Sequence, residues 1–335
     1  MQTQIDSSKG LVRNRSKIFD FLMDQALIIA FIILLVVLGS IRPEFLSFTN
    51  VIQVLAQVSI LGIIAVAITY VVIGGNFDIS VGSFISFGNI FPMMLIYTMG
   101  PGSEPIAILA TLGLGILVGC INGFLIGFLK LNSFMITLAM LSILSALSEI
   151  FFQGTAYGTL LNTSAKTIFS WMGRGMIGGV IPSSIVIFAV FAIILGIVLS
   201  KTVFGRYVYA VGGNRDASMY SGIREKWVTF YTFVLTGFAA ALGAIIWGSR
   251  YLSIMTQQGK GYELTILTAV ILGGTSLLGG SGNVFKTVIG VLIIGFVNSG
   301  VIVLGLPYYY QWLVTWFIII VAVVLDITAK RRKEA

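Results

Sequence analysis

The feature that most limits the fold of this 335-residue chain is a series of apolar runs of about 20 residues that recurs from end to end. A helix of that length matches the hydrocarbon thickness of a bilayer. Only 10% of the residues are charged, too few to cover a soluble protein of this size. Runs such as AFIILLVVLG at 30–39 do not alternate between apolar and polar residues, which excludes the strands of a membrane barrel. The sequence therefore predicts an all-α polytopic membrane protein.

We expect about ten transmembrane helices, because ten runs are long enough to count as spans. They lie at 25–41, 51–73, 81–99, 105–129, 134–153, 180–200, 228–248, 262–278, 285–304 and 309–327. The eighth run is short and ends in glycines, which predicts a broken or partly re-entrant segment. The first run is full length and no small-residue cleavage site follows it, so we expect it to remain as a helix.

The positions of lysine and arginine predict the orientation. If the N-terminus is cytoplasmic, an even number of spans returns the C-terminus to the cytoplasm, and 15 of the 20 basic residues fall in inner segments. The net charge of +8 then reflects cytoplasmic loops beside membrane lipid, and no nucleic-acid partner is expected. The predicted regions are a cytoplasmic N-terminal segment at 1–24, a transmembrane domain at 25–328 with a cytoplasmic loop at 201–227, and a basic cytoplasmic tail at 329–335.

Composition argues against an enzyme. The chain has no histidine and a single cysteine, Cys120, which lies in an apolar run. It therefore lacks the commonest metal ligand and the usual proton shuttle, and offers no thiolate cluster. A P-loop is also absent, since the sole Gly-Lys pair, at 259–260, is followed by glycine. We expect no catalytic residues, no metal site and no cofactor.

Several polar residues occupy costly positions within apolar regions. The stretch GGNFDISVGS at 74–83 is centred on Asp78, and a carboxylate at the bilayer centre costs about 2.5–3.5 kcal/mol on insertion scales. Asp78 or Ser80 could cap the third span, or line a pathway, and the two roles are compatible. The residues predicted for a translocation path are Asp78, Ser80, Asn122, Asn298, Gly273 and Gly274, with Gln53, Gln57, Asn132 and Thr268 as weaker candidates.

The glycines of ILTAVILGGTSLLGGSGN, at 266–283, allow the backbone to leave the regular helix. Unwound backbone at membrane depth is tolerated only against protein or a water-filled cavity, which favours a position near the pathway. The alternative is a glycine-rich turn at the inner surface.

A second glycine pattern runs along the fourth span. Gly115, Gly119, Gly123 and Gly127 are four residues apart and form one stripe on a helix. Such stripes let helix backbones approach closely in a membrane. The stripe predicts tight packing, either within the chain or at a dimer interface.

The stretch GRYVYAVGGNRDASMYSGI at 205–223 is polar, contains several glycines and lies between two apolar runs. We expect a chain break at Gly212 and Gly213, an N-cap at Asn214, about two helical turns, and a left-handed stop at Gly222. A helix this short is unstable alone. Its apolar face consists of Ala217, Met219 and Tyr220. This face predicts either a rigid projection that binds a cytoplasmic partner or a loop that lies on lipid headgroups.

This stretch resembles the cytoplasmic loop of permease subunits in simple-sugar ABC importers of the ribose, xylose and galactose type. The family pattern is G-R-x-x-x-A-x-G-G-N-x-x-A-x-x-x-S-G-I, and the matching residues are Gly205, Arg206, Ala210, Gly212, Gly213, Asn214, Ala217, Ser221, Gly222 and Ile223. Two further motifs are similar to the family's: GGNFDISVG, which has one additional residue before Asp78, and GGTSLLGGSG at 273–282.

The resemblance implies a permease subunit in the bacterial inner membrane that forms the path for a simple sugar and does no chemistry. It implies a second permease chain, identical or homologous, a cytoplasmic ATP-binding subunit, and an extracytoplasmic substrate-binding protein. The residues it assigns to ATPase coupling are Gly205, Arg206, Gly212, Gly213, Asn214, Ala217, Ser221 and Gly222. The outer segment 153–179, with Lys166 and Arg174, is the candidate contact for the binding protein. The alternative is a self-sufficient secondary transporter of a small polar solute, driven by ions through Asp78 or Glu149.

Overall fold

The computed structural model describes residues 26–152, 167–252, 256–307, 309–318 and 320. The predicted segments 1–24 and 329–335 lie outside these residues. The helices are α2 (Ala26–Ile41), α3 (Phe48–Ile73), α4 (Val81–Met99), α5 (Glu104–Gly127), α6 (Ser133–Phe152), α8 (Ile168–Arg174), α9 (Ser183–Lys201), α10 (Val203–Gly213), α11 (Arg215–Tyr220), α12 (Glu225–Tyr251), α13 (Tyr262–Leu272) and α14 (Val284–Val303). A 3-10 helix, η1 (Pro43–Leu46), precedes α3, and strands β1 (Met176–Ile177) and β2 (Ile181–Pro182) form a small hairpin.

The predicted helical membrane architecture is confirmed. Seven helices among the described residues are long and apolar enough to cross a bilayer: α3, α4, α5, α6, α9, α12 and α14. Shorter apolar helices lie in α2 and in α13. The last predicted span is helical over 309–318. The count of ten crossings stays a prediction.

Two helices form the centre of the bundle. The second half of α3 is buried without interruption from Val58 to Ile73. Helix α12 packs against α3, α4 and α5, and small residues at 239–241 and 243–244 let these neighbours approach its backbone. In contrast, α6 and α9 keep many aliphatic side chains exposed, as expected for helices that face lipid.

The glycine stripe of α5 is covered by α12. A β-carbon built on Gly115 would lie 2.3 Å from the carbonyl oxygen of Gly237, and one on Gly119 would lie 2.4 Å from that of Phe233. The same construction on Gly127 reaches 2.6 Å from the Lys226 oxygen. The prediction of internal packing is confirmed. The dimer-interface alternative is wrong for this stripe because α12 already occupies it.

The eighth predicted span is broken, as expected. Helix α13 has 11 residues and ends at Leu272, so it is only about 16 Å long and cannot cross a bilayer alone. The predicted limit at residue 278 is wrong because Gly274, with φ of 78°, and the turns after it leave the helix. The chain before α13 lies against α4, where the Gly259 amide donates to Ser86 Oγ at 2.9 Å.

The N-terminal ends of α4 and α13 meet inside the protein. A β-carbon on Gly82, at the start of α4, would lie 2.8 Å from the Gly259 carbonyl oxygen. Each of the two helices follows a segment of irregular backbone, at 74–80 and 256–261. Irregular backbone is stable at membrane depth only where protein or a polar cavity surrounds it.

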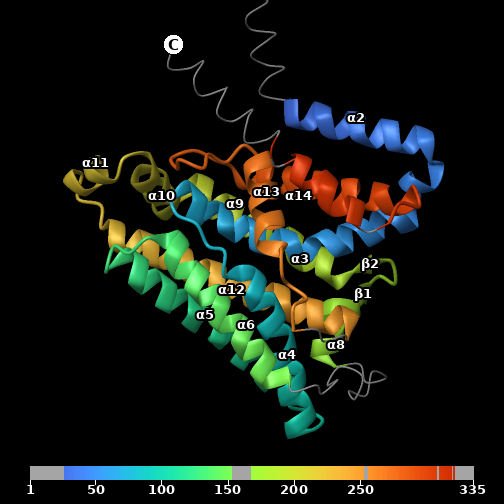
Figure 1. The fold of residues 1–335 in the computed structure, drawn as a ribbon, viewed down its shortest axis with the longest axis horizontal. Helices are drawn as coiled ribbons and strands as arrows, with labels where there is room; N and C mark the ends of the chain where they lie inside the picture. The colour runs from blue at the N-terminus through green and yellow to red at the C-terminus, as the bar shows by residue number, and fades with distance from the viewer. Residues whose placement is uncertain (1–25, 153–166, 253–255, 308, 319, 321–335) are drawn as a thin grey trace, which may run out of the picture.

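The two ends of the bundle differ. Figure 1 places α10 and α11 at one end, and α8 with the β1–β2 hairpin at the opposite end. Helix α8 is fixed to the end of α12, because the Gly173 amide donates to Ser249 Oγ at 3.0 Å. These two ends carry the two predicted partner sites.

Candidate functional site

The short helix α11 has the predicted construction. The Asn214 side chain accepts a hydrogen bond from the Ala217 amide at 2.9 Å and caps the N-terminus of α11. Gly222 follows with φ of 80° and ends it. One detail of the prediction is wrong: Gly212 and Gly213 are helical residues of α10, and the break falls at Asn214, whose backbone is extended.

The predicted apolar face of α11 is open. Tyr220 is 87% exposed and Met219 is 48% exposed, and Ala217 is exposed beside them. Ser218 faces the other way, is buried, and its Oγ donates to the Arg215 carbonyl oxygen at 2.7 Å. The face is a projection that the described part of the chain leaves uncovered.

The other predicted coupling residues support this projection. A β-carbon on Gly205 would lie 1.9 Å from the Leu199 carbonyl oxygen, so α10 packs closely on the end of α9. Arg206 is exposed on α10. Ser221 Oγ donates to the Ala217 carbonyl oxygen at 2.9 Å and closes the last turn of α11.

At the base of α11, three glycine pairs converge on one point. They are 74–75 after α3, 212–213 at the end of α10, and 279–280 in the turn after α13. We call this convergence the glycine junction. Each pair belongs to one of the three motifs singled out in the sequence. Motifs that are far apart along the chain therefore form a single structure.

Backbone contacts hold the glycine junction together. The Gly280 amide donates to the Ile73 carbonyl oxygen at 2.8 Å. A β-carbon on Gly212 would lie 1.7 Å from that same oxygen, and one on Gly279 would lie 2.8 Å from the Gly212 oxygen. Because backbone cannot move aside as a flexible side chain can, no residue larger than glycine fits at Gly212.

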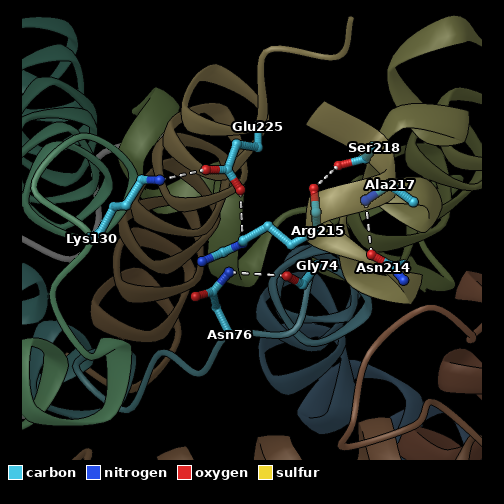
Figure 2. A network of polar contacts seen from close by, with 8 residues as sticks. All are labelled: Gly74, Asn76, Lys130, Asn214, Arg215, Ala217, Ser218 and Glu225. Carbon is cyan, nitrogen blue, oxygen red and sulfur yellow. Dashed lines mark hydrogen bonds and ion pairs between the residues drawn. The ribbon is translucent and has the colours of Figure 1, made fainter. Parts of the chain in front are cut away.

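An ion pair from α12, supported by a second one, holds α11 from the other side. Figure 2 shows Glu225, the first residue of α12, between Lys130 and Arg215. Its Oε1 lies 3.3 Å from Lys130 Nζ, and its Oε2 lies 3.0 Å from Arg215 Nε. The pairs join α11 to α12 and to the α5–α6 loop. The sequence analysis did not select Lys130 or Glu225, because no local pattern marks two residues 95 positions apart as a pair.

Replacement of Glu225 by Gln is expected to loosen α11 without unfolding the protein. The side chains of Lys130 and Arg215 are well exposed whereas that of Glu225 is nearly buried, and because water screens the two cations each pair is worth about 0.2–1 kcal/mol. Loss of about 1 kcal/mol corresponds to hydrogen exchange about five-fold faster at the amides of 215–220. Lys130→Gln removes one pair and is expected to have a smaller effect. Equal exchange in both variants and in the wild type would contradict this role.

Asp78, Ser80 and Asn122 meet in one buried network. Asp78 Oδ1 accepts from the Ser80 amide at 3.0 Å and from Ser80 Oγ at 2.5 Å, and Asp78 Oδ2 accepts from Thr236 Oγ1 at 3.1 Å. Asn122 Nδ2 donates to Ser80 Oγ at 3.2 Å. Asp78 therefore fixes the turn before α4, whereas the Ser80 side chain makes no capping bond. The network ties this turn to α5 and α12.

The other predicted path residues lie elsewhere. Gly273 ends α13 and packs on α14, where its β-carbon would lie 2.7 Å from the Lys286 oxygen. Gly274 turns the chain towards the glycine junction. Asn298 of α14 lines a cavity of about 790 Å³, together with the weaker candidate Gln57 of α3. We call this the larger cavity.

A second cavity of about 430 Å³ lies between α4, α6 and the chain before α13. Its polar lining includes Ser83, Ser145, Glu149 and Glu263. Gln257 and Lys260 line both cavities, so the segment 256–261 lies between them. The two cavities therefore share this polar segment of the chain.

Comparison with known proteins identifies the chain. Residues 50–323 match the family described as the permease component of the branched-chain amino acid transport system. The chain belongs to this permease family. It is 34% identical to the ribose import permease protein of Escherichia coli K12 over 91% of this chain and 94% of that protein. It is 36% identical to the ribose import permease protein of Bacillus subtilis, over 90% and 91% of the two chains.

A third relative, the D-allose transport system permease protein of Escherichia coli K12, is 32% identical over 88% of both chains. No solved structure is significantly similar to the chain. The family and these relatives confirm the resemblance to simple-sugar ABC importer permeases. The chain is a multi-pass inner-membrane permease and a transport protein.

Proposed function

We propose that this permease forms the path for a simple sugar in an ATP-driven importer and that α11 is where a cytoplasmic ATP-binding subunit docks. The observation that carries the proposal is the glycine junction beneath an exposed apolar helix. Basic residues support a cytoplasmic position for this end, since Lys130, Arg215 and Lys226 gather there with α10 and α11.

The glycine junction gives α11 a mechanical route into the membrane domain. Movement of the ATP-binding subunits would push on Met219 and Tyr220 and displace the end of α10. Direct backbone contact at Gly212 would carry that displacement to the end of α3 and to the turn after α13. The segment 256–261 and the two cavities lie along α13, so the same motion would reshape the polar path.

The substrate assignment rests on the relatives, because the family description names branched-chain amino acids whereas the similar proteins are named for ribose, arabinose and allose. An ion-coupled secondary transporter is less well supported. One of its two proposed coupling carboxylates, Asp78, already accepts three hydrogen bonds within a buried network. The other, Glu149, lines the smaller cavity, so the preference for an ATP-driven importer rests on the relatives.

Two further partners complete the proposed importer. A second permease chain, identical or homologous, would complete the membrane domain. An extracytoplasmic binding protein would dock at the end that carries α8, where Arg174 lies in the last turn. Residues 153–166 of the predicted contact, including Lys166, lie outside the described residues.

Reconstitution in vesicles tests the proposal. The permease is purified in mild detergent with its ATP-binding subunit and binding protein, and uptake of ribose, allose, arabinose and leucine is measured with and without ATP. The proposal predicts sugar uptake that needs ATP and the binding protein. Uptake that proceeds without ATP and stops on addition of a protonophore would instead support the secondary transporter.

A further inference from the structure

The larger cavity has a lining suited to a specific ligand. It combines amides and hydroxyls with indole rings and one cation. The residues that carry this character are Gln57 of α3, Gln257 and Lys260 of the 256–261 segment, Asn298 of α14, and Thr315 and Trp316 of the helical residues 309–318. Its volume of about 790 Å³ falls within the range of small-molecule sites.

Asn298 has a buried side-chain oxygen that lacks a hydrogen-bond donor within the described part of the chain, which is a separate indication of a ligand. Its Oδ1 atom is buried and has no hydrogen-bond partner among the described residues. A buried acceptor left without a donor costs about 1–3 kcal/mol. Asn298 lines the cavity, and a rotation of its side chain would bring this acceptor within reach of a ligand hydroxyl.

The chemistry of the lining selects the class of ligand. Amide side chains both donate and accept hydrogen bonds, as sugar hydroxyls do. The indole of Trp316 is 48% exposed and offers a flat apolar face for the C–H face of a sugar ring. No carboxylate is present among the residues described as lining this cavity, so the ammonium group of an amino acid would lack an ionic partner.

We propose that the larger cavity is a sugar-binding site within the permease itself, with Gln57 and Asn298 as hydrogen-bonding residues and Trp316 as the stacking surface. The proposal rests on the proposed function and adds to it a defined site for a neutral pentose or hexose. Gln257 and Lys260 also line the smaller cavity, so a sugar that leaves this site meets the 256–261 segment next.

Uptake by the reconstituted importer provides the first test. Gln57→Leu and Asn298→Leu are expected to reduce sugar uptake at least ten-fold, while ATP hydrolysis stimulated by the binding protein stays within two-fold of wild type. Thr98→Leu is the control, because Thr98 is exposed near the end of α4 and lines neither cavity. Wild-type uptake in both Gln57→Leu and Asn298→Leu would overturn the proposal.

Cysteine protection tests the site without relying on ATP-driven transport. In a Cys120→Ser background, Gln57→Cys is labelled with a water-soluble methanethiosulfonate reagent, with ribose, allose, arabinose or leucine present at high concentration. We expect at least one sugar to slow labelling several-fold and leucine to leave it unchanged. Labelling that no sugar slows, or that leucine alone slows, would overturn the site. If the wild-type importer shows no ATP-driven uptake but a sugar protects the thiol of the Gln57→Cys variant, the sugar-binding site is supported and the proposed ATP-driven function is contradicted.

Discussion

A methyl group added at Gly212 is expected to abolish ATP-driven uptake, whereas the same addition at Gly213 is expected to leave uptake unchanged. The β-carbon of Gly212→Ala would lie 1.7 Å from the Ile73 carbonyl oxygen and 2.8 Å from the Gly280 nitrogen. These atoms are backbone, so the end of α10 must separate from α3 and from the turn after α13. The β-carbon of Gly213→Ala meets nothing closer than 3.9 Å.

The effect should appear in coupling more than in folding. The glycine junction lies at the ends of α3 and α10, whereas most residues of the buried core lie within the helices. We expect Gly212→Ala to retain normal amounts in the membrane and ATP hydrolysis that no longer responds to the binding protein. Uptake should fall at least ten-fold, within the usual range of coupling free energies of about 1–3 kcal/mol. If Gly212→Ala takes up sugar as well as Gly213→Ala does, the glycine junction is not the route of coupling.

The second large effect concerns folding. Gly115→Leu is expected to prevent stable assembly of the bundle, while Gly113→Leu, two residues away on α5, is expected to leave the stability of the bundle unchanged. A β-carbon on Gly115 would lie 2.3 Å from the Gly237 oxygen and 2.6 Å from the Ala241 β-carbon, whereas one on Gly113 meets nothing within 4 Å. Overpacking lowers the free energy of unfolding by about 1–3 kcal/mol where side chains can adjust, and by more where the added atoms clash with backbone. Gly113 is exposed on the surface expected to face lipid.

Thermal unfolding in detergent, followed by size-exclusion fluorescence, measures this difference. Gly115→Leu should give little monodisperse protein and a midpoint well below that of wild type. Gly113→Leu, which carries the same added volume on the same helix, should match the wild type. Equal midpoints for the two variants would show that α5 and α12 do not pack as described.

Much of this architecture could be predicted from the sequence, because membrane spans depend on hydrophobicity that is visible residue by residue. The α5 glycine stripe was visible for the same reason, since its spacing of four residues marks one face of a helix. The cap at Asn214 and the stop at Gly222 follow from local backbone preferences, and both are confirmed.

What the sequence could not show was which distant segments meet. The break at Asn214 was misplaced onto two glycines because their role depends on Ile73 and Gly280, which lie far away in the chain. Asp78 was recognised as costly, but its partner Thr236 lies 158 residues away. Lys130 and Glu225 carry no signal until α11 and α12 place them together.

Photocrosslinking from Tyr220 tests the central claim, that α11 receives work from an ATP-binding subunit. Tyr220→p-benzoylphenylalanine places a reactive group at a highly exposed position of α11, and the same replacement of Trp171 in α8 serves as the opposite-end control. Membranes that are actively taking up sugar are irradiated and adducts are identified by mass spectrometry. We expect the ATP-binding subunit to be captured from position 220 and not from position 171. Adducts to lipid alone from position 220 during active uptake would contradict the account.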